Sequence, residues 1–563
     1  MISITGKRWK EKFINKNSIN KLKQDLKISD ILARLIILRN FSEEEIFSIN
    51  NNLLIKNVFK NNSDYNNAIT VITESIKNKE NICILGDYDV DGSAASSLII
   101  RFLKSINHPY FFYIPDRVND GYGASVKLFK KLILKKPKLI IMVDCGSNSI
   151  EAVEFLKQNK IKSIIIDHHE INKPYPKANS IINPKKNNGY IQYDYLCATA
   201  LVYFFLDLLI KKIKTIMNLE KYLIYVALAT VCDVMPLRKL NRTICSNVIK
   251  NFKVESNKIF KEIFYLNKKN FLNLNDLGYL VGPILNSGGR LGKSSYATEL
   301  LSSDDQKIIT RISNELIKLN NKRKTIETSI LDKINFNKIN KENKKIIFFY
   351  DPYMSEGLIG IIAARLKEYF NKPSIVITSS GKILKGSVRS TNNYNVGKAI
   401  KNALDNKIIE GGGGHSMAAG FILKKKQIKK FQNFILKDYL KNNPINEETL
   451  FYDSEISSSA INNEFYDNIK KIEPFGAGNP SPLFLLKELK IIKTTVLKNK
   501  HISVIFKSKS GKSLNSIAFN SINNKIGEYL LNYKKNLNVL AKINKNFWNN
   551  KSLLQLTIRD IIL

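Results

Sequence analysis

Three carboxylates at alternate positions, Asp87, Asp89 and Asp91, follow the apolar run 82–85 after a single glycine. Such a run is short and rich in β-branched residues, which is typical of a buried strand in a parallel sheet. In a dry cleft, three negative charges repel one another and lose their hydration. A cation among them would offset this cost. The segment therefore predicts a cation site. An exposed acidic turn is the alternative, and a calcium loop is disfavoured because its closing Glu is missing.

More residues that can bind metals follow other strand-like runs. The apolar runs of strand length are 82–85, 110–114, 139–143 and 163–166. Amphipathic segments of helical length separate them, and this alternation predicts an α/β fold with a doubly wound parallel sheet. Asp144 follows the third run, and Asp167, His168 and His169 follow the fourth. Because open α/β sheets bind ligands at the carboxyl ends of their strands, we expect these side chains to lie beside Asp87.

Asp233 and the two adjacent histidines need separate explanations. Asp233 interrupts the apolar segment 222–237, where an aspartate could cap a helix end or could belong to the same ligand set. The chain has only 5 histidines, so a pair of neighbours after an aspartate is hard to explain as an accident. Adjacent residues in an extended segment point in opposite directions, so His168 and His169 require a turn to reach one ion.

The composition narrows the classes of function. A chain of 563 residues should form roughly three or four domains. Its formal net charge of +40 favours a polyanionic partner such as nucleic acid, or an anionic membrane surface. The lysines are spread along the chain among many asparagines, however, so the charge could instead reflect a general compositional bias.

Cysteines and apolar stretches indicate the compartment. The 5 cysteines form no C-x-x-C pair, which argues against a disulfide framework or a zinc site. The basic amino terminus is not followed by an apolar core, so we expect no secretory signal. The longest apolar stretches, 198–210 and 222–237, are interrupted by Asp207 and Asp233 and are too short to span a bilayer. We therefore expect a soluble protein of the reducing cytoplasm.

The remaining segments differ in their periodicity. Residues 28–55 predict two short helices, the second opened by a capping box from Ser42 to Glu45. Residues 303–335 have a helical period and predict one long helix, and residues 344–430 predict a second α/β unit. The remainder alternates like the strands of a small β-barrel.

These residues together resemble a known family. The chain resembles the DHH phosphoesterases in four motifs, in the family's order: Asp87-x-Asp89-x-Asp91, Asp144, Asp167-His168-His169 and Asp233. Later segments resemble those of its RecJ branch, the single-strand-specific exonucleases; they are 282–290, 385–390, 411–420 and 474–480. The resemblance therefore covers nearly the full length of the chain.

The resemblance implies a domain order. We expect an N-terminal helical cover (1–60), a DHH catalytic domain (61–302), a connecting helix (303–335), a second α/β, DHH-associated domain (336–435) and a C-terminal OB-fold β-barrel (445–563).

The family resemblance also groups the candidate ligands around two divalent metal ions, Mn²⁺ or Mg²⁺. Hydrolysis of a phosphodiester needs a nucleophile and neutralisation of charge on the phosphate, which two ions about 3.5–4 Å apart can supply. The implied ligands are Asp87, Asp89, Asp144, His168 and Asp233. Asp144 and Asp233 are the candidates to bridge or orient the ions, and His169 is either a further ligand or a donor to the phosphate. Asp91 and Asp167 are expected to orient the ligands.

A second set of residues is implied to bind substrate phosphate, above all at the 5′ end of a strand. The set consists of Arg117, Arg290, Ser387, Arg389 and His415. An arginine suits this task because its planar fork can bind two phosphate oxygens at once. In so basic a chain, any single arginine could instead be a solvated surface charge. The glycines before His415 would let the backbone approach a nucleotide closely.

The implied function is a 5′→3′ exonuclease that degrades single-stranded DNA to 5′-mononucleotides in repair and recombination. We expect a monomer, with a helicase and a single-stranded-DNA-binding protein as candidate partners. The alternatives are a DHH phosphodiesterase for short oligonucleotides or cyclic dinucleotides, a manganese pyrophosphatase, or a non-catalytic single-strand-binding scaffold. The barrel and the length of the chain argue against a small substrate.

The chain departs from the family pattern at three places. Leu85 and Ser355 stand where relatives often carry histidine, and the segment 198–200 replaces a more glycine-rich one. None of these changes removes an implied metal ligand. They leave the preferred metal and the rate open.

Overall fold

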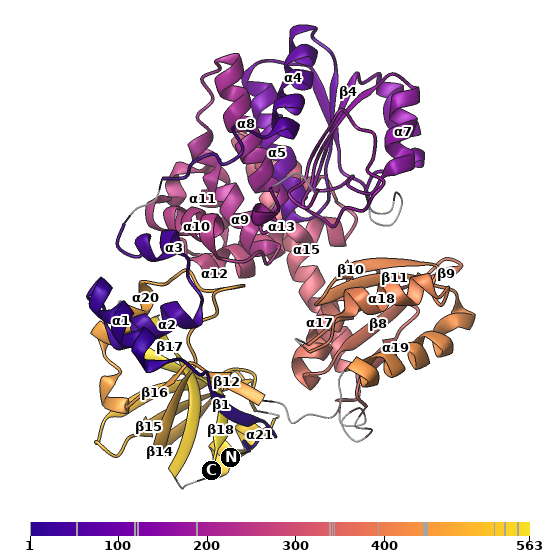
Figure 1. Ribbon diagram of the computed structural model, residues 1–563. Helices are drawn as coiled ribbons and strands as arrows, with labels where there is room; N and C mark the ends of the chain where they lie inside the picture. Colours follow the sequence, from indigo (N-terminus) through magenta and orange to yellow (C-terminus); the bar gives the residue numbers. More distant parts are fainter. Residues whose placement is uncertain are drawn as a thin grey trace. The chain divides into compact units, whose positions relative to one another are not determined.

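The computed structural model describes residues 2–51, 54–116, 120, 123–186, 190–336, 339, 342, 344–391, 393–442, 449–522, 524–533, 536–548 and 551–563. Its chain forms two compact units (Figure 1). One unit comprises Lys56–Asp233 and Val248–Ile445, and the other comprises Met1–Ile55, Val234–Asn247 and Asn446–Leu563. No helix among the described residues has both the length and the apolar character needed to cross a bilayer.

A five-stranded parallel sheet forms the centre of the first α/β domain. Its strands are β2 (Ile82–Leu85), β3 (Tyr110–Tyr113), β4 (Leu139–Val143), β5 (Lys162–Ile166) and β6 (Ser180–Ile182). Their spatial order is β3-β2-β4-β5-β6. The four predicted strands are confirmed, whereas β6 was not predicted because its apolar run is only 3 residues long. The chain order reverses between β2 and β4, the place where such sheets open to ligands.

Helices cover both faces of this sheet, which confirms the doubly wound fold. Figure 1 shows α7 on one side of β4 and α4, α5 and α8 on the other. Buried residues of α6 and α7 pack with strand residues such as Leu85 and Met142 in one core cluster. The bounds of the helices up to Asp233 are α4 (Ser63–Lys77), α5 (Val90–Ser105), α6 (Val126–Leu132), α7 (Ile150–Gln158), α8 (Ala198–Ile213) and α9 (Leu223–Cys232).

A helical region follows and leads to the second α/β domain. Its helices are α10 (Lys239–Asn251), α11 (Lys258–Leu266), α12 (Leu274–Asp276), the π-helical turn η5 (Leu277–Val281), α13 (Gly282–Arg290), α14 (Tyr296–Leu301) and α15 (Gln306–Asp332). The predicted long helix is present as α15, and Ile309, Ile312 and Leu316 form its buried stripe.

The second α/β domain has a five-stranded mixed sheet in the order β10-β11-β9-β8-β7. Its elements are β7 (Ile347–Tyr350), α17 (Ile359–Phe370), β8 (Ser374–Ser380), β9 (Ile383–Arg389), α18 (Val396–Asp405), β10 (Gly411–His415), β11 (Ala418–Leu423) and α19 (Ile428–Asn442). Val376 of β8 packs with α17, whereas its neighbours Ile375 and Ile377 pack with α18 and α19. Alternate side chains of one strand thus fill two cores.

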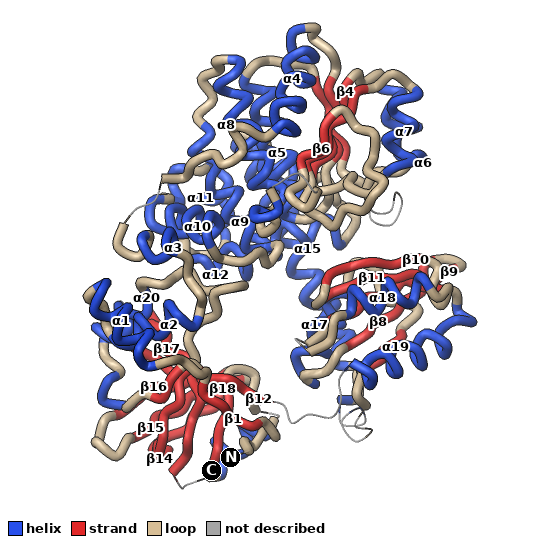
Figure 2. Tube along the Cα trace, in the orientation of Figure 1, coloured by secondary structure: helices blue, strands red, loops and turns tan. Residues whose placement is uncertain are grey.

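The other unit contains a closed barrel, as predicted. Strands β14 (Phe484–Leu497), β15 (His501–Lys507), β16 (Ser513–Ala518), β18 (Lys551–Ile562) and β17 (Asn536–Trp548) pair in that order, and β14 pairs with β17 to close the sheet. Figure 2 shows these strands in red. Further elements are β12 (Thr449–Tyr452), β13 (Ser454–Glu455), α20 (Asn463–Lys470) and α21 (Lys525–Asn532).

The amino-terminal elements pack on this barrel. They are β1 (Arg8–Glu11), α1 (Lys16–Leu26), α2 (Asp30–Leu38) and α3 (Glu43–Phe47). The two helices predicted within 28–55 are confirmed as α2 and α3, and the predicted capping box between Ser42 and Glu45 is formed. Strand β1, which was not predicted, pairs with β12, and Leu32 and Leu35 of α2 lie in the barrel core.

Candidate metal centre

The loop after β2 carries the first three aspartates into the start of α5. Asp89 is the N-cap of this 16-residue helix, and its Oδ1 accepts a hydrogen bond from Gly92 N at 3.0 Å. Asp87 Oδ1 accepts one from Tyr88 N at 2.7 Å. The amino end of α5 therefore faces this edge of the sheet, where the aligned peptide dipoles favour negative charge.

The close approach of α5 to this loop depends on Gly92. A Cβ at Gly92 would lie 2.6 Å from Asp87 N and 2.7 Å from Asp87 Cα, which requires the backbone to move. We expect Gly92→Ala to lower the free energy of unfolding by about 1–3 kcal/mol through overpacking. Without the clash, this change in a helix would stabilise the protein by up to about 1 kcal/mol.

Chemical denaturation checks this expectation. Gly411→Ala is the matched control, because no described atom lies within 4 Å of a Cβ at Gly411. Equal stabilities of Gly92→Ala and wild type would contradict the close approach.

Asp144 follows β4 in a strained conformation. Its φ of 60° lies in the left-handed region, which is uncommon for a residue other than glycine. The side chain is 2% exposed, and no described group donates a hydrogen bond to its Oδ1. A buried carboxylate oxygen without a donor is costly in the absence of a cation.

His168 connects Asp144 to Asp233. His168 Nε2 lies 3.3 Å from Asp144 Oδ1, 3.5 Å from Asp233 Oδ2 and 3.6 Å from Asp91 Oδ2. Asp233 is also the C-cap of α9, so it occupies the helix end and faces the cluster at the same time. The sequence had left these two roles as alternatives.

The candidate ligands form overlapping groups. Ligand atoms lie within 4.8 Å of one another in three sets: Asp87, Asp89 and Asp144; Asp144, His168 and His169; and Asp91, His168 and Asp233. Asp144 and His168 each belong to two sets. These two residues therefore connect the three sets.

Asp91 and Asp167 are occupied by protein donors. Asp91 Oδ1 accepts hydrogen bonds from Thr199 N at 2.8 Å and Thr199 Oγ1 at 2.6 Å, and its Oδ2 accepts one from Ala198 N at 2.8 Å. Asp167 Oδ1 accepts hydrogen bonds from His168 N and from His169 N and Nδ1. Both carboxylates are thus suited to orient other ligands, although Asp91 also belongs to one of the three sets.

The cluster carries excess negative charge. Burial, reinforced by the charges of Asp91 and Asp89, raises the pKa of Asp233 to about 8. Burial and the neighbouring aspartates also hold the pKa of Asp144 well above its usual range. Burial lowers the pKa of His168 to about 4, which keeps the ring neutral and able to bind a metal. A divalent cation among these carboxylates would offset the repulsion that raises their pKa values, so the residues present fit such an ion.

Three of the predicted phosphate ligands gather around the start of α17. Arg290, the last residue of α13, donates from Nη1 to Gly357 O at 3.0 Å. Arg389 Nη1 donates to Ser387 Oγ at 3.1 Å, and a Cβ at Gly360 would lie 3.0 Å from Arg389 Nη2. This arrangement combines two guanidinium groups with a helix amino end, which suits an anion.

The other two predicted phosphate ligands have different outcomes. Arg117 lies outside the described residues. His415 lies beside the candidate metal ligands, with its ring centroid 6.1 Å from that of His169. The strand register aligns His415 with Ala418 and Ala418 with Arg389, so His415 and Arg389 lie at the same end of the mixed sheet, about 10 Å apart.

Several supporting residues were missed from the sequence. Asn183, directly after β6, donates from Nδ2 to Ser147 Oγ at 2.8 Å and to His169 O at 2.9 Å. The sequence pattern that could have indicated Asn183 is a polar residue directly after an apolar run. That run, β6, is only 3 residues long and was not predicted as a strand. Thr199, which binds Asp91, lies in a segment noted only as a departure. Leu85 is fully buried in the core of the parallel sheet.

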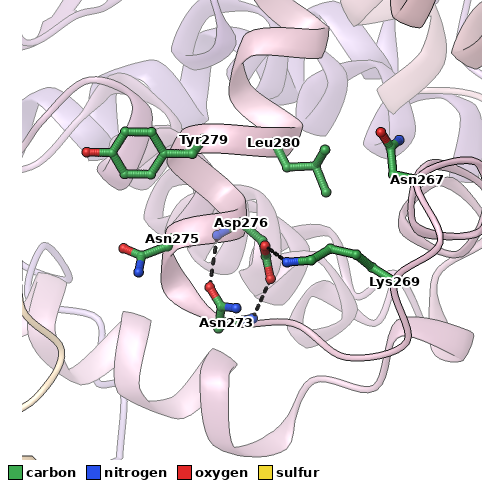
Figure 3. Close-up of a pocket in the computed structure, with 7 residues that line it drawn as sticks. All are labelled: Asn267, Lys269, Asn273, Asn275, Asp276, Tyr279 and Leu280. Atoms are coloured by element: carbon green, nitrogen blue, oxygen red, sulfur yellow. Dashed lines mark hydrogen bonds and ion pairs between the residues drawn. The ribbon is translucent and has the colours of Figure 1, made fainter. Parts of the chain in front are cut away.

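A hollow of about 430 Å³ lies elsewhere, along α12 and η5. Figure 3 shows Tyr279 and Leu280 above the ion pair between Lys269 and Asp276, and the hydrogen bonds between Asp276 and Asn273. None of the residues proposed as metal or phosphate ligands lines it. Lys269, Asp276 and Asn273 are engaged with one another, and we assign this hollow no part in the chemistry.

Three domain families match the chain. The DHH family N-terminal domain matches residues 81–230, the DHHA1 domain matches residues 343–441, and the RecJ OB domain matches residues 452–560. The first match includes the candidate ligands after β2, β4 and β5 and ends just before Asp233.

Relatives with established names match most of the chain. The single-stranded-DNA-specific exonuclease RecJ of Haemophilus influenzae is 30% identical over 514 residues, which cover 86% of this chain and 88% of the relative. RecJ of Bacillus subtilis is 25% identical over 567 residues, which cover 98% of this chain and 70% of the relative.

Solved structures show the same fold. RecJ from Thermus thermophilus in complex with Mn²⁺ matches with a TM-score of 0.82 at 21% identity, covering 99% of this chain and 80% of that chain. Its complex with Mg²⁺ gives a TM-score of 0.75 at 20% identity, covering 99% of this chain and 78% of that chain.

Proposed function

The chain belongs to the RecJ family, and we propose that it is a 5′→3′ exonuclease that hydrolyses single-stranded DNA to 5′-mononucleotides in repair and recombination. The observation that carries the proposal is the set of overlapping ligand groups centred on Asp144, whose buried Oδ1 accepts no hydrogen bond from the described residues. A closed OB-type barrel supports a single-stranded substrate, since such barrels generally bind single strands through a basic groove and stacked aromatics.

The proposed cofactors are two divalent ions, Mn²⁺ or Mg²⁺, held by Asp87, Asp89, Asp144, His168 and Asp233. When bound, such ions activate a water molecule and neutralise charge on the phosphate oxygens. Asp91 and Asp167 hold the ligand loops, the first through Thr199 and the second through both histidines. His169 Nδ1 donates to Asp167 at 2.8 Å, so its Nε2 is the atom turned to a metal or a phosphate.

The arginine cluster defines which end of the strand is presented. We propose that Arg290, Ser387 and Arg389 bind the terminal 5′ phosphate, with His415 between this cluster and the metal centre. A fixed separation between the terminal phosphate and the hydrolysed bond would release one nucleotide at each step. Arg117 remains in the proposed set on its sequence resemblance alone.

Partners and compartment complete the proposal. A helicase and a single-stranded-DNA-binding protein would supply and hold the substrate strand, and the enzyme would act as a monomer. The five cysteines are all free thiols, which supports the reducing cytoplasm.

One assay separates the proposed function from its alternatives. The protein is incubated with labelled single strands, blunt duplexes and dinucleotides in Mn²⁺ or Mg²⁺, and released mononucleotides are measured. We expect release from single strands and little from duplexes. Preference for dinucleotides would indicate a phosphodiesterase for small substrates, and binding without cleavage would indicate a scaffold.

A further inference from the structure

Lys185 lies in the loop that leaves the sheet beside the histidines. Strand β6 pairs in parallel with β5, with Ile166 opposite Ile182, so residues after 182 leave the same edge as Asp167, His168 and His169. This loop carries no residue that the family motifs assign to the chemistry.

Asn183 fixes the position of Lys185 relative to the metal centre. Its side chain is buried, its Nδ2 donates to His169 O at 2.9 Å, and its Oδ1 accepts from Lys185 N at 2.9 Å. One amide therefore ties the backbone of Lys185 to the backbone of a candidate ligand.

The ammonium group of Lys185 lies next to the segment that carries the histidines. Its ion-pair partner Glu170 directly follows His169 in the loop after β5. The ring centroid of His169 lies 6.1 Å from that of His415, the last residue of β10. The loop after β5 and the end of β10 therefore meet beside the backbone that Asn183 ties to Lys185.

The present partner of Lys185 is easily exchanged. Lys185 Nζ lies 3.0 Å from Glu170 Oε1, and the Glu170 side chain is 68% exposed whereas that of Lys185 is 17% exposed. An ion pair with such an exposed carboxylate contributes little to stability. A phosphate can replace it at small cost and forms a stronger charge-assisted hydrogen bond.

We propose that Lys185 binds the phosphodiester group held at the metal centre, as a substrate contact separate from the arginines that bind the terminal phosphate. The proposal rests on the proposed exonuclease function. Its chemistry is recognition of the DNA backbone: a flexible ammonium neutralises one phosphate and does not discriminate among bases.

The adjacent lysine provides a matched control. Lys186 Nζ lies 2.7 Å from Asp64 Oδ1 of α4, and the Asp64 side chain is 11% exposed. Lys186→Ala therefore removes the same charge from the neighbouring residue without removing the proposed phosphate contact. Lys185→Arg keeps a cation at the proposed position.

Binding is measured without turnover by using a single strand with phosphorothioate linkages, which resist hydrolysis, so that all proposed metal ligands stay intact. Fluorescence anisotropy with a labelled, 5′-phosphorylated single strand in Mg²⁺ gives the binding constant K over a range of salt concentrations. We expect Lys185→Ala to make the slope of log K against log salt shallower by about 0.7, the effect of one lost phosphate contact on a single strand. We expect Lys186→Ala and Lys185→Arg to keep the parent slope.

Activity in the otherwise wild-type protein gives a second readout. We expect Lys185→Ala to lower kcat/KM on the order of tenfold, and Lys186→Ala to change it less than about twofold. If Lys185→Ala and Lys186→Ala give equal salt slopes while the wild-type protein is an active exonuclease, the proposed role of Lys185 is wrong. The proposed exonuclease function would not be affected by that result. Absence of cleavage by the wild-type protein would overturn the proposed function and this inference with it.

Discussion

Replacing Asp144 by Asn is expected to lower the rate of single-strand cleavage by roughly 10³-fold or more. Even mutation of a residue that only holds a metal ligand in place lowers metal affinity or activity by about 10–100-fold. Asp144 belongs to two of the three candidate ligand sets, so we expect this one substitution to weaken binding of both proposed ions. Asn keeps the shape of the side chain, and it removes the charge that two divalent ions require. Cleavage rates in Mn²⁺ and in Mg²⁺ measure the loss of activity, and calorimetric titration with Mn²⁺ measures the loss of metal binding.

The Asp144 variant needs a control for the general effect of losing a carboxylate. Asp405→Asn provides one, because Asp405 is an exposed residue at the end of α18. We expect its cleavage rate and its metal titration to match those of the wild type. A near wild-type rate for Asp144→Asn, or unchanged Mn²⁺ binding, would remove Asp144 from the proposed ligand set.

The second large effect concerns the 5′ end of the substrate. We expect Arg389→Ala to lower kcat/KM for 5′-phosphorylated strands by roughly 10–100-fold, the equivalent of about 1.5–3 kcal/mol for a lost charge-assisted contact. Strands with a 5′ hydroxyl lack the group that Arg389 binds and should lose much less. The measurement is the ratio of kcat/KM for the two substrates in each variant.

Arg311→Ala is the control for loss of positive charge. Arg311 is an exposed residue of α15 in the same unit as Arg389. We expect it to leave the ratio between the two substrates unchanged. An equal loss on both substrates in Arg389→Ala would refute binding of the terminal phosphate by this residue.

The first α/β domain was largely predictable because its signals are local. Three of the predicted strands are almost continuous buried runs, and the candidate ligands other than Asp233 follow their strands within a few residues, as Asp144 follows β4. The parallel pairing then brings the carboxyl ends together without further information. The predicted position of the metal centre therefore needed only the order of strands and acidic residues. The individual metal, phosphate and orienting roles stay predictions, as do the domain limits.

The supporting contacts could not be predicted because they join distant segments. Asp91 binds Thr199, more than 100 residues further along the chain, and nothing near either residue indicates the pairing. Strand β6 is too short to give a periodic signal, so Asn183 was missed with it. Similarly, Trp9 Nε1 donates to Asp560 at the far end of the chain, which ties the amino-terminal segment to the barrel.

The release of label from the two ends of one strand tests the proposed direction and chemistry together. A 5′-phosphorylated single strand is labelled at its 5′ end or at its 3′ end and incubated with the protein and Mn²⁺. We predict that the 5′ label appears as a mononucleotide from the earliest times, while the 3′ label remains on strands that shorten progressively, and that Asp144→Asn abolishes both changes. Early release of the 3′ label, or internal cuts that leave a labelled oligonucleotide, would contradict the account.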